Sequence, residues 1–309
     1  MRTYLDCYPC LLGQALEAAR MARADEREQR HILERVLDLL RDVPPSSKPP
    51  QISQPVHRIV REEIGSEDPY RETKARSTEE GLALYPWMER ALAEADDKLV
   101  TAARLSIAGN VIDARPGRSY DLREELERSL SEPLAIDDAE ALRAALNEAD
   151  WALFLADNAG ETVCDRLLIE TMGIPVTYVV KGGPIANDAT VEDAQAAGVD
   201  RVAELMSSGS DAPGTLLGQC SEELRRAYEE APLIIAKGQG NYESLDEAGP
   251  RVFFLLQAKC PVLARDVGVP ARSLVLRQGD GSDRDCPDKN DEGLDTDGTT
   301  EVNDREHRL

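Results

Sequence analysis

Two polar segments of the sequence combine oxygen-bearing side chains with glycine, and each follows a short apolar run. The first, Asp157-Asn158-Ala159-Gly160-Glu161, follows the run 151–156; the second, which contains Asp188, follows the run 175–180. Carboxylate and amide oxygens suit a hard divalent cation. A helix that starts after such a turn presents free N–H groups to a phosphate. Taken alone, each segment also fits an ordinary helix cap, because Asp, Asn and Thr are preferred N-cap residues.

Lysines follow three of the apolar runs. Lys181 comes after the run 175–180, Lys237 after 233–236 and Lys259 after 252–256. A lysine at the end of an apolar strand is costly to bury unless it meets an anion or solvent. The three positions therefore favour an anionic ligand, and only seven lysines occur in the whole chain.

A glycine-rich segment, 237–243, contains Gly240 and Asn241. Glycines there would let backbone N–H groups approach phosphate oxygens. The segment is not a Walker loop, because no G-x-x-x-x-G-K-[ST] occurs. Earlier in the chain, Asn110 and Asp113 lie beside Gly109, in a pattern that also fits the end of a helix.

The six cysteines include one C-x-x-C, Cys7-Tyr8-Pro9-Cys10. No second pair completes a four-ligand zinc site, so a structural, a metal-binding and a redox role all stay open. The chain has no H-x-x-x-H pair, no G-x-S-x-G elbow and no G-x-G-x-x-G after the first apolar run. These absences argue against zinc-peptidase, α/β-hydrolase and dinucleotide-binding chemistry.

The elements that must position these side chains change in kind near residue 150. Before it we expect helices and no strand; after it, apolar runs that read as strands alternate with helices. Strands of this kind indicate a parallel sheet covered on both faces, with ligands bound at the carboxyl ends of the strands. The expected helices are 11–43, 54–64, 71–95, 97–108, 121–130, 136–148, 161–172, 190–196 and 221–230; the expected strands are 151–156, 175–180, 201–206, 233–236 and 252–256.

The length of 309 residues fits two domains, and we predict a mainly helical domain at 1–148, an α/β domain at 149–278 and a tail at 279–309. The tail carries 11 acidic and 4 basic side chains and almost nothing apolar, which predicts disorder. No apolar run is long enough for a membrane span, and the first residues lack the apolar core of a signal peptide. We therefore expect a cytoplasmic protein without a membrane partner.

The net charge is −23, from 59 acidic and 36 basic residues. Such a surface repels phosphate backbones, so a nucleic-acid partner is not expected. Many carboxylates, few lysines and only 4% aromatic residues predict a halophilic protein, one adapted to concentrated salt, which screens this self-repulsion. The sequence gives no indication of the oligomeric state.

Together, these segments resemble the damage-control phosphatase family of metal-dependent enzymes, over about residues 4–278. The resemblance rests on four ordered motifs of the α/β half: the 157–161 segment, 187–190, 236–243 and 254–260. Three earlier segments match as well, namely 6–10 with its C-x-x-C, which is typical of the compact archaeal and bacterial branch, Asp68-Pro69-Tyr70 with Lys74, and 106–113. The resemblance implies a helical N-terminal domain on a Rossmann-like, three-layer α/β/α domain with a mostly parallel sheet.

The resemblance also assigns roles. It implies that Asp157, Asn158 and Asp188 bind a divalent metal ion, Mn²⁺ first, with Co²⁺, Ni²⁺ or Mg²⁺ as alternatives. Asp157, Asp188 and Lys259 are then the expected catalytic residues. The expected substrate-binding residues are Asn110, Glu161, Lys237, Gly240, Asn241 and Lys259.

The implied activity is hydrolysis of small phosphorylated metabolites, such as sugar phosphates or phosphorylated cofactor intermediates, including damaged ones. Charge neutralisation by a metal and by lysine suits such a phosphomonoesterase. Two alternatives stay open. One is a nucleotide- or cofactor-binding module without hydrolysis, supported by the glycine-rich segments. The other is a carboxyl methyltransferase that uses S-adenosylmethionine, with which the α/β half is compatible.

Overall fold

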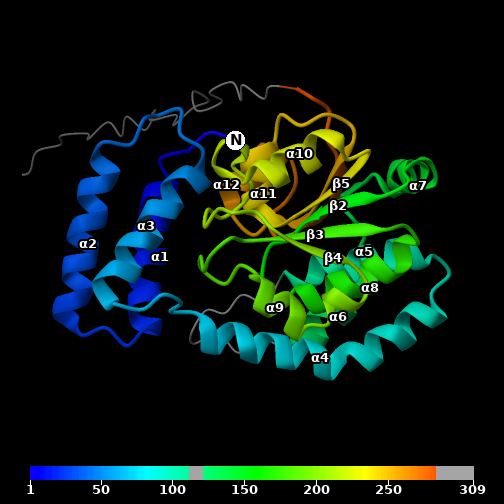
Figure 1. Ribbon diagram of the computed structural model, residues 1–309, viewed down its shortest axis with the longest axis horizontal. Helices are drawn as coiled ribbons and strands as arrows, with labels where there is room; N and C mark the ends of the chain where they lie inside the picture. The colour runs from blue at the N-terminus through cyan, green and yellow to red at the C-terminus, as the bar shows by residue number, and fades with distance from the viewer. Residues whose placement is uncertain (111–120, 283–309) are drawn as a thin grey trace, which may run out of the picture.

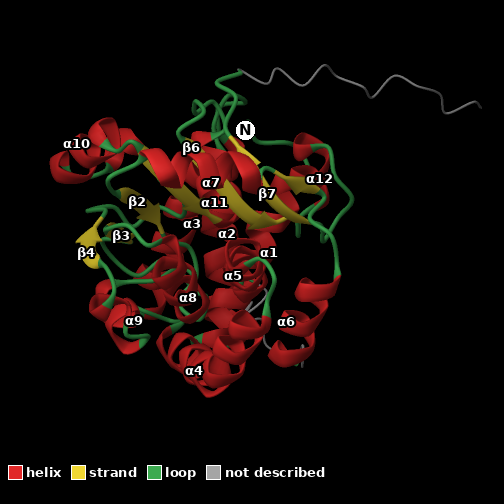
Figure 2. Cartoon of the chain, turned by 90° about the vertical axis from the view of Figure 1, so that its right-hand side faces the viewer, coloured by secondary structure: helices red, strands yellow, loops and turns green. Residues whose placement is uncertain are grey.

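The computed structural model describes residues 1–110 and 121–282. Asp113, Cys286 and nearly all of the predicted tail lie outside the described residues. The described chain is a mixed α/β fold whose single sheet has helices on both faces (Figures 1 and 2). The predicted fold class is confirmed, with the sheet between two helical layers.

The sheet has seven strands in the order β1-β7-β6-β5-β2-β3-β4. All neighbouring strands are parallel except β6 and β7, which are antiparallel and pair Leu255 with Leu276. The strands are β1 (Ile136–Asp137), β2 (Ala152–Leu155), β3 (Val176–Val180), β4 (Glu204–Ser207), β5 (Leu233–Lys237), β6 (Val252–Gln257) and β7 (Leu274–Gln278). The strand order reverses between β2 and β5, and such a switch point is where open α/β sheets bind ligands.

Five predicted strands are present as β2 to β6. Strands β2, β3, β5 and β6 form because their mostly apolar side chains are buried on both faces of the sheet. The run predicted at 201–206 is strand only from Glu204, as the edge strand β4, whose side chains are exposed or partly buried. Two strands were not predicted. The prediction of no strand before residue 148 is wrong at β1, whose two residues pair with β7 and carry no pattern of their own. The segment 274–278 forms β7, the antiparallel partner of β6.

The helices before the first central strand are α1 (Cys7–Met21), α2 (Glu26–Arg41), α3 (Pro49–Ile64), α4 (Arg71–Glu94), α5 (Lys98–Gly109), α6 (Leu122–Ser131) and α7 (Ala139–Glu148). The single helix expected over 11–43 is in fact two helices. The Asp25 side chain accepts a hydrogen bond from Glu28 N at the start of α2, and the Glu28 side chain accepts one from Asp25 N. This capping box begins a new helix four residues after α1 ends.

The later helices are α8 (Thr162–Met172), α9 (Val191–Ala196), α10 (Glu222–Glu230), α11 (Gly238–Leu245) and α12 (Pro261–Val267). The glycine-rich segment 237–243, which is not among the expected helices, is mostly helix, because α11 begins at Gly238, directly after β5. Helix α12 was not predicted.

Three hydrophobic cores hold the chain together. One joins α1, α2 and α3, which stand beside the sheet in Figure 1. A second lies between one sheet face and helices that include α4, α5 and α8, and a third covers the other face with α10, α11 and α12. The second core contains residues on both sides of the predicted domain boundary at 148, and that boundary stays a prediction.

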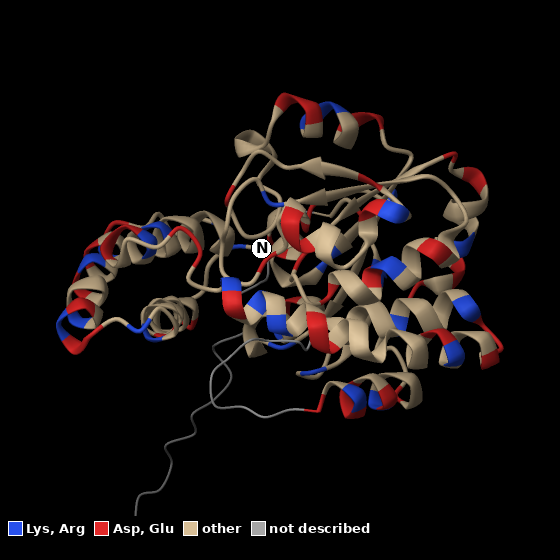
Figure 3. Cartoon of the chain, turned by 60° about the horizontal axis from the view of Figure 1, so that its bottom comes forward, with Lys and Arg blue, Asp and Glu red and all other residues tan. Residues whose placement is uncertain are grey.

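The docking of α3 onto the sheet is polar. Asp211, which follows β4, accepts hydrogen bonds from Gln54, Arg58 and Arg61 of α3, and Arg61 also donates to the carbonyl of Pro184. The three-helix unit is thereby attached beside the carboxyl ends of the strands. Acidic and basic residues alternate along the outer helices (Figure 3). Among the described residues, no helix combines the length and the apolar character that crossing a bilayer requires.

Candidate metal and phosphate site

The predicted site residues after β2 and β3 come together at the switch point of the sheet. Asn158 and Asp188 form an isolated antiparallel bridge between the two loops. Two backbone bonds fix it: Ala159 N donates to Asn187 O at 2.9 Å, and Ala189 N donates to Asp157 O at 2.8 Å. The side chains of Asp157, Asn158 and Asp188 are all buried or nearly so.

Two asparagine amides bridge the carboxylates of Asp157 and Glu161. Asn110 Nδ2 donates to Asp157 Oδ2 and to Glu161 Oε2, at 2.7 Å each. Asn158 Nδ2 donates to the same two oxygens, at 2.9 and 3.1 Å. Asn110 caps the carboxyl end of α5, and Glu161 precedes the first turn of α8. The close approach of α5 to α8 depends on Gly109, where a Cβ would lie 2.9 Å from Cys164 Sγ.

Asp188 presents an unsatisfied oxygen in this cluster. Its Oδ2 is buried and accepts no hydrogen bond from the described residues, although Lys181 Nζ lies 3.5 Å away as an ion pair. Lys181 Nζ directs a better hydrogen bond to the carbonyl of Gly214, at 2.9 Å. Burying a carboxylate oxygen without a hydrogen-bond donor costs free energy, and a cation bound to that oxygen would offset the cost.

Behind the cluster lies a buried ionic group. Lys237 Nζ contacts Glu161 Oε1, Asp165 Oδ1 (2.6 Å) and the carbonyl of Ser106 (3.1 Å). All three charged side chains have 0% exposure. An ammonium has three protons, so these three acceptors occupy Lys237 fully. The side chain predicted to bind substrate is thus paired with protein carboxylates.

Gly238 allows the backbone after β5 to pass close to Asp157. Its φ is +75°, and a Cβ there would lie 1.9 Å from Asp157 Oδ2. Only glycine takes this conformation freely and leaves the space that the carboxylate occupies.

Of the other predicted substrate-binding residues, one lies beside the carboxylate cluster and two are in packing and hydrogen-bonding contacts. Lys259 is half-buried and its Nζ donates to the carbonyl of Asn110, which puts it beside the carboxylate cluster. Asn241 is fully buried in α11, where its amide donates to the carbonyls of Lys237 and Ala156 and its oxygen accepts from Thr215. Gly240 packs against Gly214. The structure thus uses the Asn241 side chain to hold the ends of β2 and β5.

The electrostatics of the cluster reflect its burial. Burial raises the pKa of Asp157 well above the ordinary value, and the charges of Asp188 and Glu161 raise it further. Burial likewise raises the pKa of Asp188 to about 6, against the opposing effect of Lys181. Burial also raises the pKa of Asp165 to about 6, although Lys237 opposes it. For Lys237, burial acts to lower the pKa, but Asp165 and Glu161 outweigh it and the pKa is raised.

Four residues of the site are not among the predicted site residues: Asp165, Ser106, Tyr178 and Gly238. Asp165 accepts hydrogen bonds from Ser106 Oγ (2.7 Å) and Tyr178 OH (2.8 Å). One signal was available, since Asp165 follows Glu161 by four residues and thus lies on the same face at the start of α8. Ser106 begins the matched segment 106–113, but its residue type indicates no role, and nothing in the local sequence marks Tyr178. The two side chains reach Asp165 from α5 and β3.

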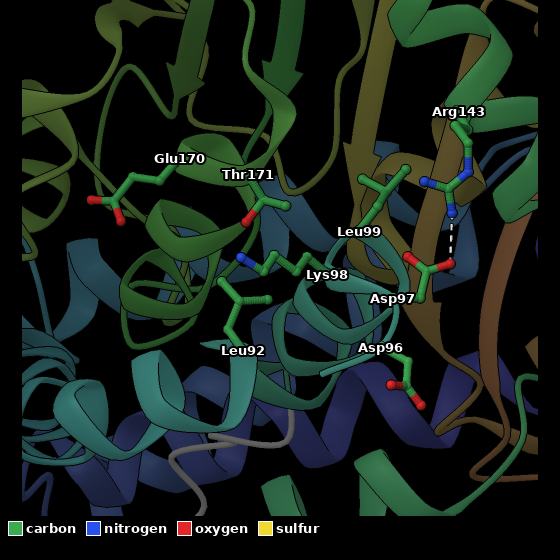
Figure 4. A pocket seen from close by; sticks show the side chains of 8 residues that line it. All are labelled: Leu92, Asp96, Asp97, Lys98, Leu99, Arg143, Glu170 and Thr171. Carbon is green, nitrogen blue, oxygen red and sulfur yellow. Dashed lines mark hydrogen bonds and ion pairs between the residues drawn. The ribbon is translucent and has the colours of Figure 1, made fainter. Parts of the chain in front are cut away.

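A hollow of the described surface lies away from the carboxylate cluster. Its volume is about 680 Å³, and it is lined by the end of α4, the start of α5, the end of α8 and Arg143 of α7, which pairs with Asp97 at 2.6 Å (Figure 4). The carboxylate cluster lies at the opposite ends of α5 and α8. Within the residues that the structure describes, no three His, Cys, Asp or Glu side chains form a metal-binding group. The predicted ligand set includes only two such side chains, with Asn158 as the third.

Comparison with known proteins decides the family. The model of the damage-control phosphatase ARMT1-like domain matches residues 3–275. The chain belongs to the damage-control phosphatase family. The resemblance predicted from the motifs is confirmed, and this family match covers the helical part as well as the α/β part.

Individual members of the damage-control phosphatase family align over nearly their whole length. A damage-control phosphatase of Archaeoglobus fulgidus is 36% identical over 282 residues, which are 88% of this chain and 97% of that protein. A damage-control phosphatase of Pyrococcus horikoshii is also 36% identical, over 89% and 97% of the two chains. The crystal structure of a DUF89 family protein from Pyrococcus horikoshii superposes with a TM-score of 0.83 at 34% identity, covering 90% of this chain and 99% of that one.

Proposed function

We propose that this member of the damage-control phosphatase family hydrolyses small phosphorylated metabolites with the help of a divalent metal ion held by Asp157, Asn158 and Asp188. The observation that carries the proposal is the convergence of these three side chains at the switch point of the sheet, fixed by the bridge between Asn158 and Asp188. Membership of a phosphatase family supports the reaction class.

The charges of the cluster fit a divalent cation. Four buried carboxylates, those of Asp157, Glu161, Asp165 and Asp188, stand against the two buried ammonium groups of Lys181 and Lys237. When all are ionised, these six groups carry two negative charges in excess, and the half-buried Lys259 beside them offsets one, so the net charge that a cation would meet is negative. The donor set is carboxylate and amide oxygen, as hard cations such as Mn²⁺ and Mg²⁺ prefer. The Asp188 oxygen without a donor adds to this fit.

When bound, the metal ion would place positive charge against the phosphoryl oxygens. The residues of the chain position the groups around it. The amides of Asn110 and Asn158 orient the carboxylates of Asp157 and Glu161. Lys259, beside Asn110, is suited to bind a phosphate oxygen and to stabilise the negative charge that develops there. Among the predicted phosphate-binding groups, Gly240 and Asn241 contribute mainly by holding the loop ends in place.

The finer proposal concerns metal and substrate. Mn²⁺ is the metal we expect to support activity best, with Co²⁺, Ni²⁺ or Mg²⁺ as alternatives. The substrates we propose are phosphomonoesters of sugars or of cofactor intermediates, damaged forms included.

The test is release of phosphate from p-nitrophenyl phosphate and from a panel of metabolite phosphates, with Mn²⁺ and with chelator. We expect Mn²⁺-dependent release that Asp157→Asn lowers at least 100-fold, on the order of what a misplaced catalytic group costs. The matched control is Asp200→Asn, an exposed carboxylate outside the site, which should keep full activity. Activity that survives chelation, or full activity of Asp157→Asn, would refute the proposal. Ligand binding without phosphate release would favour a binding module, and methyl transfer from S-adenosylmethionine would favour the methyltransferase.

A further inference from the structure

The ionic group of Lys237, Glu161 and Asp165 lies directly behind the proposed metal ligands. Each of its three charged side chains has 0% exposure, and the three proton positions of Lys237 are taken by Glu161, Asp165 and the carbonyl of Ser106. The group therefore has no free donor to offer a substrate phosphate. The group contacts buried protein groups, namely the proposed metal ligands and the surrounding elements.

Glu161 connects Lys237 to the proposed metal ligands through hydrogen bonds. Its Oε1 contacts Lys237, while its Oε2 accepts from the side-chain amides of Asn110 and Asn158 at 2.7 and 3.1 Å. The same two amides donate to Asp157 Oδ2. A rotation of the Glu161 carboxylate would break its bonds to both amides, so the orientation of Asp157 depends on Glu161.

Asp165 fixes Lys237 from the other side. Its Oδ1 receives Lys237 Nζ at 2.6 Å and Ser106 Oγ at 2.7 Å, and its Oδ2 receives Tyr178 OH at 2.8 Å. The donors come from α5, β3 and β5, and β2 lies between these two strands in the sheet. A buried ammonium that loses one carboxylate moves toward the other or draws in water, because an unpaired buried charge is costly.

We propose that Asp165 and Lys237 are positioning residues: they hold Glu161, and through the amides of Asn110 and Asn158 they hold the carboxylate of Asp157 in its ligand orientation. Neither side chain touches the substrate. This assigns Lys237 a role different from the phosphate binding expected from the sequence. The expected effect on metal affinity rests on the proposed function. The expected effect on the positions of the Asn110 and Asn158 amides does not.

The first test needs no metal and no substrate. The chain has seven asparagines, so selective ¹⁵N labelling gives few side-chain NH₂ signals in metal-free protein. We expect Asp165→Asn, which keeps the size but removes the charge facing Lys237, to shift the signals of Asn110 and Asn158. The matched control is Tyr85→Phe, which removes a hydrogen bond to Glu170, another carboxylate of α8 remote from the site. It should leave both signals in place. Unchanged signals in Asp165→Asn would overturn the proposal.

The second test measures metal affinity and catalysis separately. In titration calorimetry with MnCl₂, Asp165→Asn should weaken the Kd at least tenfold, and kcat should fall with KM within about twofold, since a misplaced ligand costs chemistry more than substrate binding. Native Mn²⁺ affinity together with lowered thermal stability would show a merely structural role and overturn the proposal. If Asp165→Asn does not fold, Tyr178→Phe removes only the hydroxyl bonded to Asp165 Oδ2, and an unchanged Kd there would overturn it equally. Wild-type protein that binds Mn²⁺ but releases no phosphate would refute the proposed function and leave the positioning role standing.

Discussion

Replacing Gly238 by alanine should damage the site far more than it damages the fold. An alanine Cβ at Gly238 would lie 1.9 Å from Asp157 Oδ2, and ordinary contacts begin at 3.4 Å, so the carboxylate must move by about 1.5 Å. That movement breaks the bonds from Asn110 and Asn158. A misplacement of about 1 Å at a reacting group costs roughly 100-fold in rate, so we expect kcat to fall at least that far.

The cost to stability should be smaller. At φ +75° an alanine is strained by roughly 1–2 kcal/mol relative to glycine. Gly173 is the matched control, because its φ is +72° and no atom lies within 4 Å of an added Cβ. Urea unfolding of the two variants, with phosphatase assays on the same samples, separates the effects. We expect Gly173→Ala to lose about this strain energy alone and to keep its activity, whereas Gly238→Ala also loses the two hydrogen bonds to Asp157. Equal activity in the two variants would refute the reasoning.

Three further predictions concern stability. Although burial acts to raise it, hydrogen bonds from Arg58, Gln54 and Arg61 hold the pKa of Asp211 well below its ordinary value, so the stabilisation is present at neutral pH and is lost as pH falls below about 4. In urea titrations, Asp211→Ala should therefore lower the free energy of unfolding by about 1–2 kcal/mol at pH 7 and by less at pH 3. The value allows for solvent screening at Arg58, which is half exposed. A loss of stability that is the same at both pH values would contradict this prediction. Burial raises the pKa of Glu243 from 4.5 to about 7, so its ionisation lowers stability as pH rises through that window, and Glu243→Gln should raise the melting temperature relative to wild type more at pH 8 than at pH 5; the opposite order would contradict it. The net charge of −23 predicts a melting temperature that rises by several degrees between 0.1 M and 1 M KCl, over which the screening length falls from about 10 to about 3 Å, and a constant or falling value would remove the case for adaptation to salt.

The central part of the fold could be predicted because its sequence signals are local. Strands β2, β3 and β5 are continuous apolar runs, and each is followed by a polar residue that ends the run. Strand β7 could not be predicted in this way, since its place is set by antiparallel pairing with β6. The helix break at Asp25 was predictable in principle, because Asp25 and Glu28 form a capping box.

The site could be predicted only in part, for a similar reason. Asp157, Asn158 and Asp188 follow strands directly, so the topology alone brings them together. Lys237 also follows a strand, but only the structure shows it turned inward to Glu161 and Asp165. Partnerships of this kind depend on how α5 packs on α8, which residue types and spacing do not determine.

The most direct test of the metal site is anomalous diffraction at the manganese edge from crystals soaked in MnCl₂. We expect one strong peak in contact with the oxygens of Asp157, Asn158 and Asp188. A peak only elsewhere, for example at Cys7 and Cys10, or no peak at this end of the sheet, would contradict it.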